Sequence, residues 1–339
     1  VGAIRLLKEC APNTRMHVKN LKPVHADLIR KNLALNNLPS GETEIEVSRK
    51  EATFLFAELA QEKFLSDPPP RSPNVISIDP FGTPNLYLDS AFKTIQSYQG
   101  LACITATDTA VLFGVRPDAC MRKYGSKPLR TEYIKELGAR ILLHLISRVA
   151  NVNNLGVIPL FTFYSSHFIR AFVLTFNNRN DIANAFEHYG YFIHCKQCQY
   201  RAPWENDVLS LPKTCPACGE SKVLDFCGPL WIGPLHQDEF IDELITMNKN
   251  NHEEQKEKLE KLLTMIKGEV DMPAAYFDVH KWSKRLKLGI LPKLDFLIEF
   301  LRARGYRASR THFDFTAIKT DARPEEFSEL LVKCSKEVS

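Results

Sequence analysis

Four cysteines in two close pairs form the clearest chemical pattern in the sequence. Cys195 and Cys198 make one Cys-x-x-Cys pair, and Cys215 and Cys218 make a second pair after sixteen intervening residues. Two such pairs supply four thiolates for a tetrahedral Zn²⁺ ion and leave no open position for catalysis. The spacing therefore predicts a structural zinc site resembling a zinc ribbon. Two unrelated hairpins are the alternative, and the context disfavours a thioredoxin-like redox pair.

The remaining cysteines do not extend this pattern. They are scattered through apolar or mixed segments and show no disulfide-like spacing: Cys10, Cys103, Cys120, Cys227 and Cys334. Metal-bound and free thiols are typical of a reducing compartment. We therefore expect a reducing compartment: the cytoplasm, or the nucleus or a mitochondrion of a eukaryotic cell.

A second chemical pattern is an acid followed by a rigid turn. A buried apolar strand over Asn74–Ile78 ends at Asp79, and the residues Pro80-Phe81-Gly82-Thr83-Pro84 follow. Two prolines and a glycine fix the direction of the chain here. A carboxylate at a strand end can accept a proton from an amine, and the adjacent ring can stack on a planar base. The alternative is an aspartate that caps the next helix.

The elements around this turn predict an α/β fold. Strands at Met16–Leu21, Thr43–Val47, Asn74–Ile78 and Leu101–Ala106 alternate with helical patterns, and a long apolar helix is predicted over Glu132–Val149. Such alternation is typical of a mostly parallel sheet with helices on both faces. Ligands of these sheets bind outside the carboxyl ends of the strands, which is where Asp79 would lie.

The C-terminal part of the chain is basic. Residues 281–323 carry eleven Lys or Arg and four Asp or Glu, a net charge of +7, whereas the whole chain carries +4. Helices over His252–Lys267 and Pro292–Arg304, followed by a hairpin of Tyr306–His312 with Ala317–Thr320, give a winged-helix-like order. A concentrated basic module indicates a polyanionic partner, and a solvated helix face is the alternative.

Length and composition limit the classes of protein to which this chain can belong. The chain has 339 residues, 44% hydrophobic and 25% charged, which fits two folded domains and excludes bulk disorder. We identify no apolar run of membrane-spanning length and no secretory signal. The patterns therefore predict a protein without a membrane partner, and we expect a monomer.

Several blocks of residues together resemble the archaeal and eukaryotic tRNA guanine-26 N2-dimethyltransferase family along nearly the whole chain. The blocks are Asp79–Pro84, Thr105–Asp108, Arg122–Tyr124, Arg130–Glu132, Gly228–Pro234, Ser309–Phe313 and Lys319–Ala322. The resemblance implies an S-adenosylmethionine-dependent, Rossmann-like class I methyltransferase domain over residues 1–177. It implies a tRNA-binding domain over 178–339 that includes the cysteine site, 195–218.

The resemblance also implies a mechanism at the turn. Asp79 would orient the guanine N2 amine and accept its proton, and the Pro80 carbonyl would hold the second hydrogen. Phe81 would stack on the flipped-out base, and Gly82 would leave room for the methyl group already added. For tRNA, the residues implied are Asp108, Arg130, Arg307, Arg310, His312 and Lys319. Asp108 has helix capping as its alternative role.

The residues that would bind the cofactor are also implied by this resemblance, and the sequence differs from the family at several positions of the cofactor site. The residues implied are Arg5, Asn20, Glu51, Ala52 and Asp79. Val1–Glu9 corresponds to the helix after the family's first strand and Gly-containing turn, which this sequence lacks. Gly2 stands where an arginine is usual, and Asn20 stands where an acid would bind the ribose. We therefore expect weakened cofactor binding, most of all for the chain as given.

Two other functions remain open from the sequence. A non-catalytic tRNA-binding paralogue is favoured by Gly2, Asn20 and the missing front, and opposed by the intact Asp79–Gly82 turn. A methyltransferase for amino groups of DNA would share the Asp-Pro-aromatic logic but not the C-terminal blocks. The enzyme acting on tRNA remains the leading hypothesis.

Overall fold

The computed structural model describes residues 2–9, 14–36, 44–65, 72–205, 207–249 and 256–337. The chain divides into two compact units, Val1–Ser72 and Pro73–Ser339. The domain boundary expected after Asn177 thus lies inside the second unit. Among the described residues, no helix combines the length and the apolar character needed to cross a bilayer.

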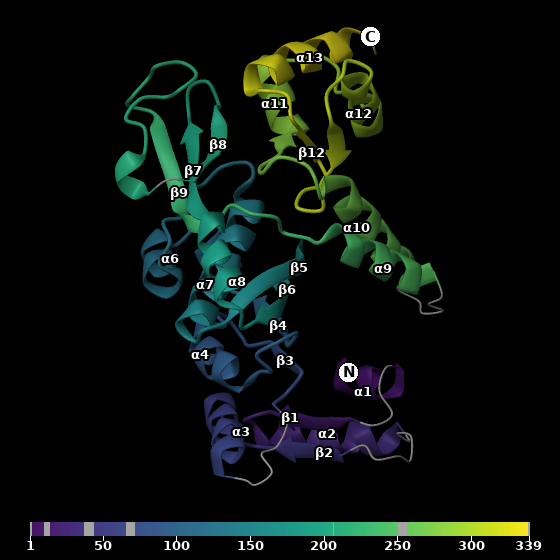
Figure 1. Ribbon diagram of the computed structural model, residues 1–339. Helices are drawn as coiled ribbons and strands as arrows, with labels where there is room; N and C mark the ends of the chain where they lie inside the picture. The colour runs from purple at the N-terminus through teal and green to yellow at the C-terminus, as the bar shows by residue number, and fades with distance from the viewer. Residues whose placement is uncertain are drawn as a thin grey trace. The chain divides into compact units, whose positions relative to one another are not determined.

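The first unit is built on a parallel pair of strands, purple in Figure 1. Its elements are α1 (Gly2–Glu9), β1 (Arg15–Lys19), α2 (Pro23–Leu35), β2 (Glu44–Ser48) and α3 (Ala52–Leu65). The strands predicted at Met16 and Thr43 are confirmed over their described residues, as is the helix near the start of the chain. Val1, Cys10 and Thr43 themselves lie outside the described residues. The parallel pairing directs the ends of β1 and β2 to one edge.

The second unit begins with a four-stranded sheet in the order β3-β4-β6-β5. Its strands are β3 (Val75–Ile78), β4 (Leu101–Ala106), β5 (Gly156–Ser165) and β6 (Phe168–Phe176). β3 and β4 are parallel, whereas β6 is antiparallel to both β4 and β5. The expectation of a mostly parallel sheet therefore holds only for β1–β2 and β3–β4. Two residues join β5 to β6, and so short a connection can form only an antiparallel hairpin.

Helix α7 (Ile134–Val152) lies at the centre of the second unit and packs against β5, β6 and β9 (Figure 1). Most of its side chains are buried, as its apolar sequence predicts. The shorter helices around it are α4 (Asn85–Thr94), α5 (Thr109–Leu112), α6 (Pro117–Tyr124) and α8 (Arg179–Asn184), with a 3₁₀ turn over Ala185–His188.

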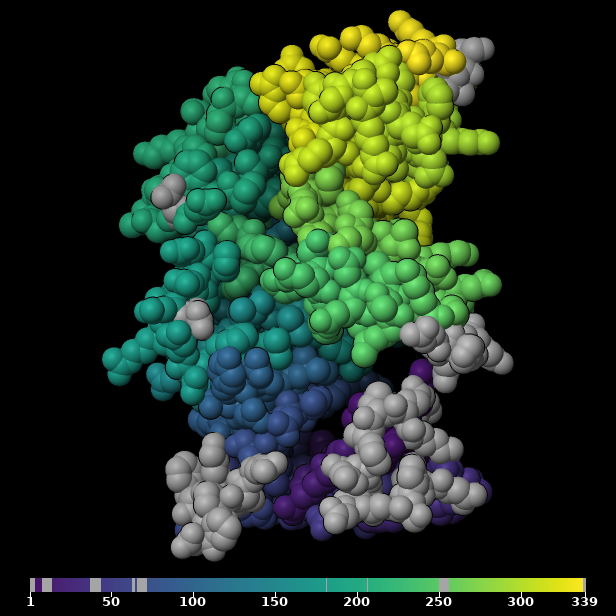
Figure 2. All heavy atoms as spheres, turned by 45° about the vertical axis from the view of Figure 1, so that its right-hand side comes forward, coloured from purple at the N-terminus to yellow at the C-terminus, as the bar shows by residue number. Residues whose placement is uncertain are grey.

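A second sheet carries the cysteines, and two helices follow it. The sheet is antiparallel in the order β8-β7-β9, with β7 (Tyr189–Cys195), β8 (Arg201–Trp204) and β9 (Leu224–Trp231), and a 3₁₀ turn covers Val208–Ser210. α9 (Asp238–Lys249) and α10 (Lys256–Glu269) then pack against each other. In Figure 2 their green surface continues into the yellow C-terminal segment.

The C-terminal segment is a small sheet covered by helices around its own apolar core. The sheet order is β10-β12-β11, with β10 (Phe277–Asp278), β11 (Ala308–Arg310) and β12 (Ala317–Thr320). The helices are α11 (Val279–Leu286), α12 (Leu294–Arg302) and α13 (Pro324–Glu337). The predicted helix and hairpin are confirmed, since β11 and β12 pair in antiparallel register. We name residues 275–337 the C-terminal module.

Three buried histidines make the stability of the second unit sensitive to acid. Burial lowers the pKa of His144 and His194 from 6.5 to about 4, and that of His236 to about 3. The folded protein keeps these rings neutral, whereas the unfolded chain protonates them below pH 6.5 or so. Because the unfolded state then binds more protons, the free energy of unfolding decreases as the pH falls from about 6.5 to 4. We expect the thermal midpoint to decrease over this range.

His144→Phe provides the control for this pH dependence. The phenyl ring retains the edge contact with Tyr189 but removes one titrating group. The variant should lose less stability between pH 7 and pH 4.5 than the parent protein. Calorimetric midpoints that are equal at the two pH values, or higher at pH 4.5, would contradict the assignment of neutral buried histidines.

Candidate active site and metal centre

Asp79 lies at the edge where the two parallel strands of the second unit end. It directly follows β3, and Thr107 directly follows β4, the parallel neighbour of β3. Parallel strands present their carboxyl ends at the same edge of a sheet. The Asp79 residue is exposed, and Phe81 is completely exposed. A carboxylate and an aromatic ring are thus both open to solvent at this edge.

Thr107 holds the turn that carries these two side chains. Its hydroxyl accepts a hydrogen bond from the Gly82 N–H at 2.7 Å, and its own N–H donates to the Gly82 carbonyl at 3.0 Å. The hydroxyl also donates to the Pro80 carbonyl over 3.5 Å. Gly82 has a φ of +107°, which a residue with a side chain rarely adopts. Sequence reasoning missed Thr107, although its place after the neighbouring strand was a usable signal.

Asp108 anchors α6 at the same edge. Its carboxylate accepts hydrogen bonds from the Tyr124 hydroxyl at 2.6 Å and from the Lys123 ammonium at 3.2 Å. Burial and the bond to Asp108 raise the pKa of Tyr124, so the phenol remains a donor. The Asp108 side chain makes no capping bond to α5, so the capping interpretation is wrong. With both oxygens engaged and 11% of the side chain exposed, Asp108 is not placed for direct contact with tRNA.

All three arginines assigned to tRNA lie at the surface. Arg130 and Arg307 are exposed, and Arg310 is partly exposed. Arg307 pairs with Asp321 at 3.0 Å, and Arg310 pairs with Asp295 at 2.8 Å. The positive charges of Arg307 and Arg310 are therefore partly compensated by carboxylates of the C-terminal module.

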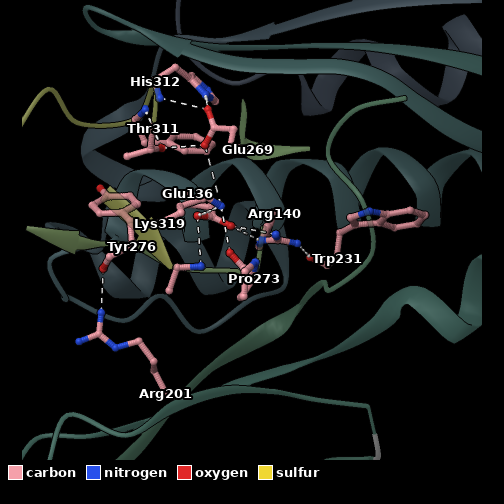
Figure 3. A network of polar contacts seen from close by, with 12 residues as sticks. Glu136, Arg140, Arg201, Trp231, Glu269, Pro273, Tyr276, Thr311, His312 and Lys319 are labelled. Carbon is pink, nitrogen blue, oxygen red and sulfur yellow. Dashed lines mark hydrogen bonds and ion pairs between the residues drawn. The ribbon is translucent and has the colours of Figure 1, made fainter. Parts of the chain in front are cut away.

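The other two basic residues assigned to tRNA, His312 and Lys319, are buried. Lys319 Nζ lies 2.8 Å from Glu136 Oε2 and donates to the Pro273 carbonyl at 3.2 Å (Figure 3). His312 Nδ1 bonds to Glu269, whose carboxylate also accepts the His312 backbone N–H at 3.0 Å. The expectation that His312 and Lys319 contact tRNA is corrected by this burial, because both side chains interact with buried carboxylates.

Glu136 on α7 is the centre of this buried network (Figure 3). It accepts hydrogen bonds from Arg140 at 2.8 and 3.0 Å, and Arg140 donates to the Trp231 carbonyl at 3.1 Å. Burial opposes ionisation of Glu136, but Lys319 and Arg140 lower its pKa below the usual value. The network therefore joins α7, β9 and the C-terminal module. A cavity of about 290 Å³ borders it, with Glu269 in its wall.

The residues assigned to the cofactor in the first unit lie near the strand ends. Asn20 follows β1, and Glu51 lies just beyond β2, so both are close to the edge where these parallel strands end. Glu51 accepts the Thr53 N–H at 2.7 Å and thereby caps α3. Burial would raise its pKa, but the bonds from Thr53 lower it. Ala52 is buried at the start of α3, and Arg5 is exposed on α1.

The four paired cysteines converge as their spacing predicts. Their sulfur atoms all lie within 4.8 Å of one another. Cys195 is 3.8 Å from Cys218, and Cys198 is 3.6 Å from Cys215, between sulfur atoms. A tetrahedral zinc ion with Zn–S bonds of about 2.3 Å requires sulfur separations of roughly 3.8 Å. The donor set and its spacing therefore fit zinc.

Two matching turns form this cluster. The Gln199 N–H donates to the Cys195 carbonyl and the Gly219 N–H to the Cys215 carbonyl, both at 2.9 Å. Gln199 and Gly219 both have positive φ, +63° and +75°, so the glycine is used as expected. Burial would raise the pKa of Cys215, but backbone N–H groups lower it to about 7. This favours the thiolate form that binds a metal.

Arg201 on β8 connects the cysteine-bearing sheet to other segments of the second unit by an ion pair, a hydrogen bond and a ring contact. Its guanidinium pairs with Glu132 at 2.7 Å, donates to the Tyr276 carbonyl at 2.7 Å and lies 4.4 Å from the Phe277 ring centre. Glu132 also accepts the Trp282 indole N–H at 2.9 Å. Sequence reasoning missed Arg201, because its partners come from two distant segments of the chain, at Glu132 and at Tyr276–Phe277.

Comparisons with known proteins agree on one family. The model of the family described as N2,N2-dimethylguanosine tRNA methyltransferase matches residues 1–332. The chain is 35% identical to the tRNA (guanine(26)-N(2))-dimethyltransferase of Methanosphaera stadtmanae, over 98% of this chain and 80% of the relative. It is 34% identical to that of Methanosarcina barkeri, over 98% and 79%. The structure of Trm1 from Pyrococcus horikoshii in complex with S-adenosyl-L-methionine is similar, with a TM-score of 0.81, 30% identity, and coverage of 97% and 84%.

Proposed function

Because the chain belongs to the N2,N2-dimethylguanosine tRNA methyltransferase family, we propose residue roles for its reaction at the Asp79 turn. The protein transfers methyl groups from S-adenosylmethionine to the exocyclic N2 amine of guanine 26 in tRNA, as the names of its relatives indicate. Its fold is a mixed α/β fold similar to that of Trm1. We further propose that the sheets with parallel strand pairs belong to a class I, Rossmann-like methyltransferase domain.

Asp79 is proposed to act on the amine of the guanine base. That amine is a weak nucleophile because its lone pair is delocalised into the ring, so orientation and proton removal both matter. The exposed carboxylate would accept one N–H and then take the proton as the new bond to carbon forms. The Pro80 carbonyl would hold the second hydrogen. S-adenosylmethionine would supply the methyl group from its sulfonium centre and leave as neutral S-adenosylhomocysteine.

The neighbouring residues of the turn support this role by their exposure. The ring of Phe81 is open to solvent and available to stack on a flipped-out guanine. An added Cβ at Gly82 would meet no atom within 4 Å, so there is open space beside the turn for a methylated amine. Thr107 would keep the Pro80 carbonyl directed toward that amine. These observations favour an enzyme over a non-catalytic tRNA-binding protein.

For the cofactor, we propose that Asn20 binds ribose hydroxyls and that Glu51 and Ala52 lie near the adenine. Asn20 and Glu51 are near the strand ends of the first unit, the usual place for a nucleotide in such sheets. Arg5 is proposed to meet the methionine part of the cofactor. Asn20 would bind a hydroxyl less strongly than a carboxylate does.

The proposed activity is tested with defined tRNA transcripts. The protein is incubated with labelled S-adenosylmethionine and a transcript that carries guanine at position 26, and the nucleosides are analysed by mass spectrometry. N2-methyl- and N2,N2-dimethylguanosine are expected. A matched transcript with adenine at position 26 should remain unlabelled. Equal labelling of both transcripts, or labelling of neither, would refute the assignment.

We propose that the four-cysteine cluster holds a structural zinc ion in a zinc-ribbon-like insertion. Cys215→Ser is expected to lose one equivalent of zinc and to expose β7–β9 to proteolysis, because the metal organises the turns that end these strands. Metal content is measured by elemental analysis of the purified protein. Cys334→Ala, which changes a buried cysteine outside the cluster, should keep the metal. Full zinc occupancy in Cys215→Ser would contradict the site.

The C-terminal module is proposed to bind tRNA. Its order β10-α11-α12-β11-β12, in which two helices precede a hairpin, is winged-helix-like, and Arg307 and Arg310 lie at that hairpin. Arg130, between α6 and α7, is proposed as a tRNA contact outside the module. Phosphate contacts from such a module would offset the cost of flipping the base. We also propose a monomeric protein in a reducing cytoplasm, where free thiols persist.

A further inference from the structure

Helix α11 of the C-terminal module carries a cluster of cations. Four arginines elsewhere in the module are paired with carboxylates: Arg304 with Glu337, Arg307 with Asp321, Arg310 with Asp295 and Arg323 with Glu326. Arg302 donates instead to the Ala308 carbonyl. On α11 and its C-cap, Lys284, Arg285 and Lys287 are exposed. None of these three forms an ion pair with a carboxylate in the part of the chain that the structure describes. Their charge is therefore available to an anionic partner.

The cations of α11 lie along one face of a firmly packed helix. Lys281, Lys284 and Arg285 follow helical spacing, so they project from the same side. The opposite face is buried through Val279 and Ser283, and Trp282 on the flank of the helix packs its ring at 5.4 Å against Phe327. A row of cations on a fixed helix does not have to be ordered when a partner binds, which reduces the entropic cost of binding.

This face continues onto the first cysteine turn. Arg285 donates to the Gln197 carbonyl at 3.0 Å, between Cys195 and Cys198. The preceding residue of that turn, Lys196, is exposed and lies 3.3 Å from Asp225.

Asp225 extends the connection toward the Asp79 edge. It also pairs with Lys127 at 2.7 Å, and Lys127 comes shortly after α6, the helix that Asp108 anchors. Two lysines share this single carboxylate, so the trio keeps a net positive charge. Cations therefore follow a connected path from α6 across the cysteine turn to α11.

We propose that this path, which we name the α11 surface and define as Lys127, Lys196, Lys284, Arg285 and Lys287, binds the phosphodiester backbone of the tRNA substrate. The inference rests on the proposed function and assigns its substrate contact to particular residues. Closely spaced cations along a rigid surface complement the regular negative charges of an RNA backbone. The cysteine cluster then has a second consequence, because it fixes the turn that supports Arg285.

The test compares two triple variants that remove equal charge. One is Lys284→Gln/Arg285→Gln/Lys287→Gln. The control is Lys93→Gln/Lys267→Gln/Arg323→Gln, two lysines and one arginine that are each paired with carboxylates. The affinity for tRNA is measured directly at several salt concentrations, with no methyl transfer required. Thermal unfolding is recorded for each variant to confirm that it folds.

The α11 triple variant is expected to bind tRNA roughly tenfold or more weakly at moderate salt. The slope of log affinity against log salt should decrease by about 0.7–0.9 for each phosphate that the variant no longer neutralises. KM for tRNA should rise with little change in kcat, because binding to the backbone stabilises ground state and transition state equally. The control triple should stay within about twofold of the parent.

Three results distinguish failure of the α11 surface from failure of the proposed function. A parent protein that methylates and binds tRNA, with an α11 triple variant of equal affinity and equal salt slope, overturns the α11 surface alone. An equal decrease of affinity in both triple variants also overturns it, because only net charge would then matter. A parent protein that neither binds nor methylates tRNA overturns the proposed function itself.

Discussion

Asp79→Ala is expected to lower the single-turnover rate of methyl transfer to tRNA by about 10²–10⁴-fold, the range typical for loss of a positioned proton acceptor. The residue is exposed at the end of β3, and its turn is fixed by bonds from Gly82 to Thr107. Truncation therefore removes the carboxylate without disturbing a buried side chain. Affinities for tRNA and S-adenosylmethionine should change far less than the rate, and rapid-quench kinetics at saturating concentrations measures the effect.

Two further variants define what the carboxylate does. Asp79→Asn keeps the size and one acceptor oxygen but cannot take up a proton, so its rate should fall nearly as far as that of alanine. Asp89→Ala is the matched control, an exposed aspartate on α4 whose partner is Lys93. It should retain the parent rate. A rate for Asp79→Ala within threefold or so of the parent would remove Asp79 from the chemistry.

Lys319→Met is expected to destabilise the second unit by about 3–5 kcal/mol, because it leaves Glu136 buried beside one cation instead of two. Both side chains are buried, and their charged atoms lie 2.8 Å apart. For a unit of this size the thermal midpoint should fall by roughly 10 °C. Differential scanning calorimetry at pH 7 provides the measurement.

A double variant and a surface control make this prediction specific. Glu136→Gln/Lys319→Met removes both charges of the pair and should be less destabilised than the sum of the single variants. Lys267→Met removes a lysine that also contacts two carboxylates, Asp238 and Asp242, but at the surface. Its midpoint should remain close to that of the parent. Additive effects in the double variant would show that Glu136 and Lys319 act independently.

The features that the sequence predicted well are those determined locally. An apolar strand followed by Asp79 and a turn of prolines and glycine predicts, from neighbouring residues alone, a carboxylate at the end of a strand. The Cys-x-x-Cys turns are equally local, since each needs one positive φ just after its second cysteine. The hairpin of β11 and β12 follows from alternating residues, and its pairing confirms it.

The features that the sequence could not predict depend on partners far along the chain. Lys319 and His312 occur in a basic segment, and residue type alone does not distinguish an exposed side chain from a buried one. Their burial follows from contacts with Glu136 on α7 and Glu269 on α10, which lie far from Lys319 and His312 along the chain. The hydrogen bond between Arg285 and the cysteine turn likewise joins segments about ninety residues apart.

The most direct measurement of the central claim is the position of guanine 26 in a structure of the protein bound to tRNA and S-adenosylhomocysteine. We expect the base to be flipped out, stacked on Phe81, and bound through its N2 amine to the Asp79 carboxylate at about 2.6–3.2 Å. A base held elsewhere, with Asp79 turned away from the amine, would contradict it.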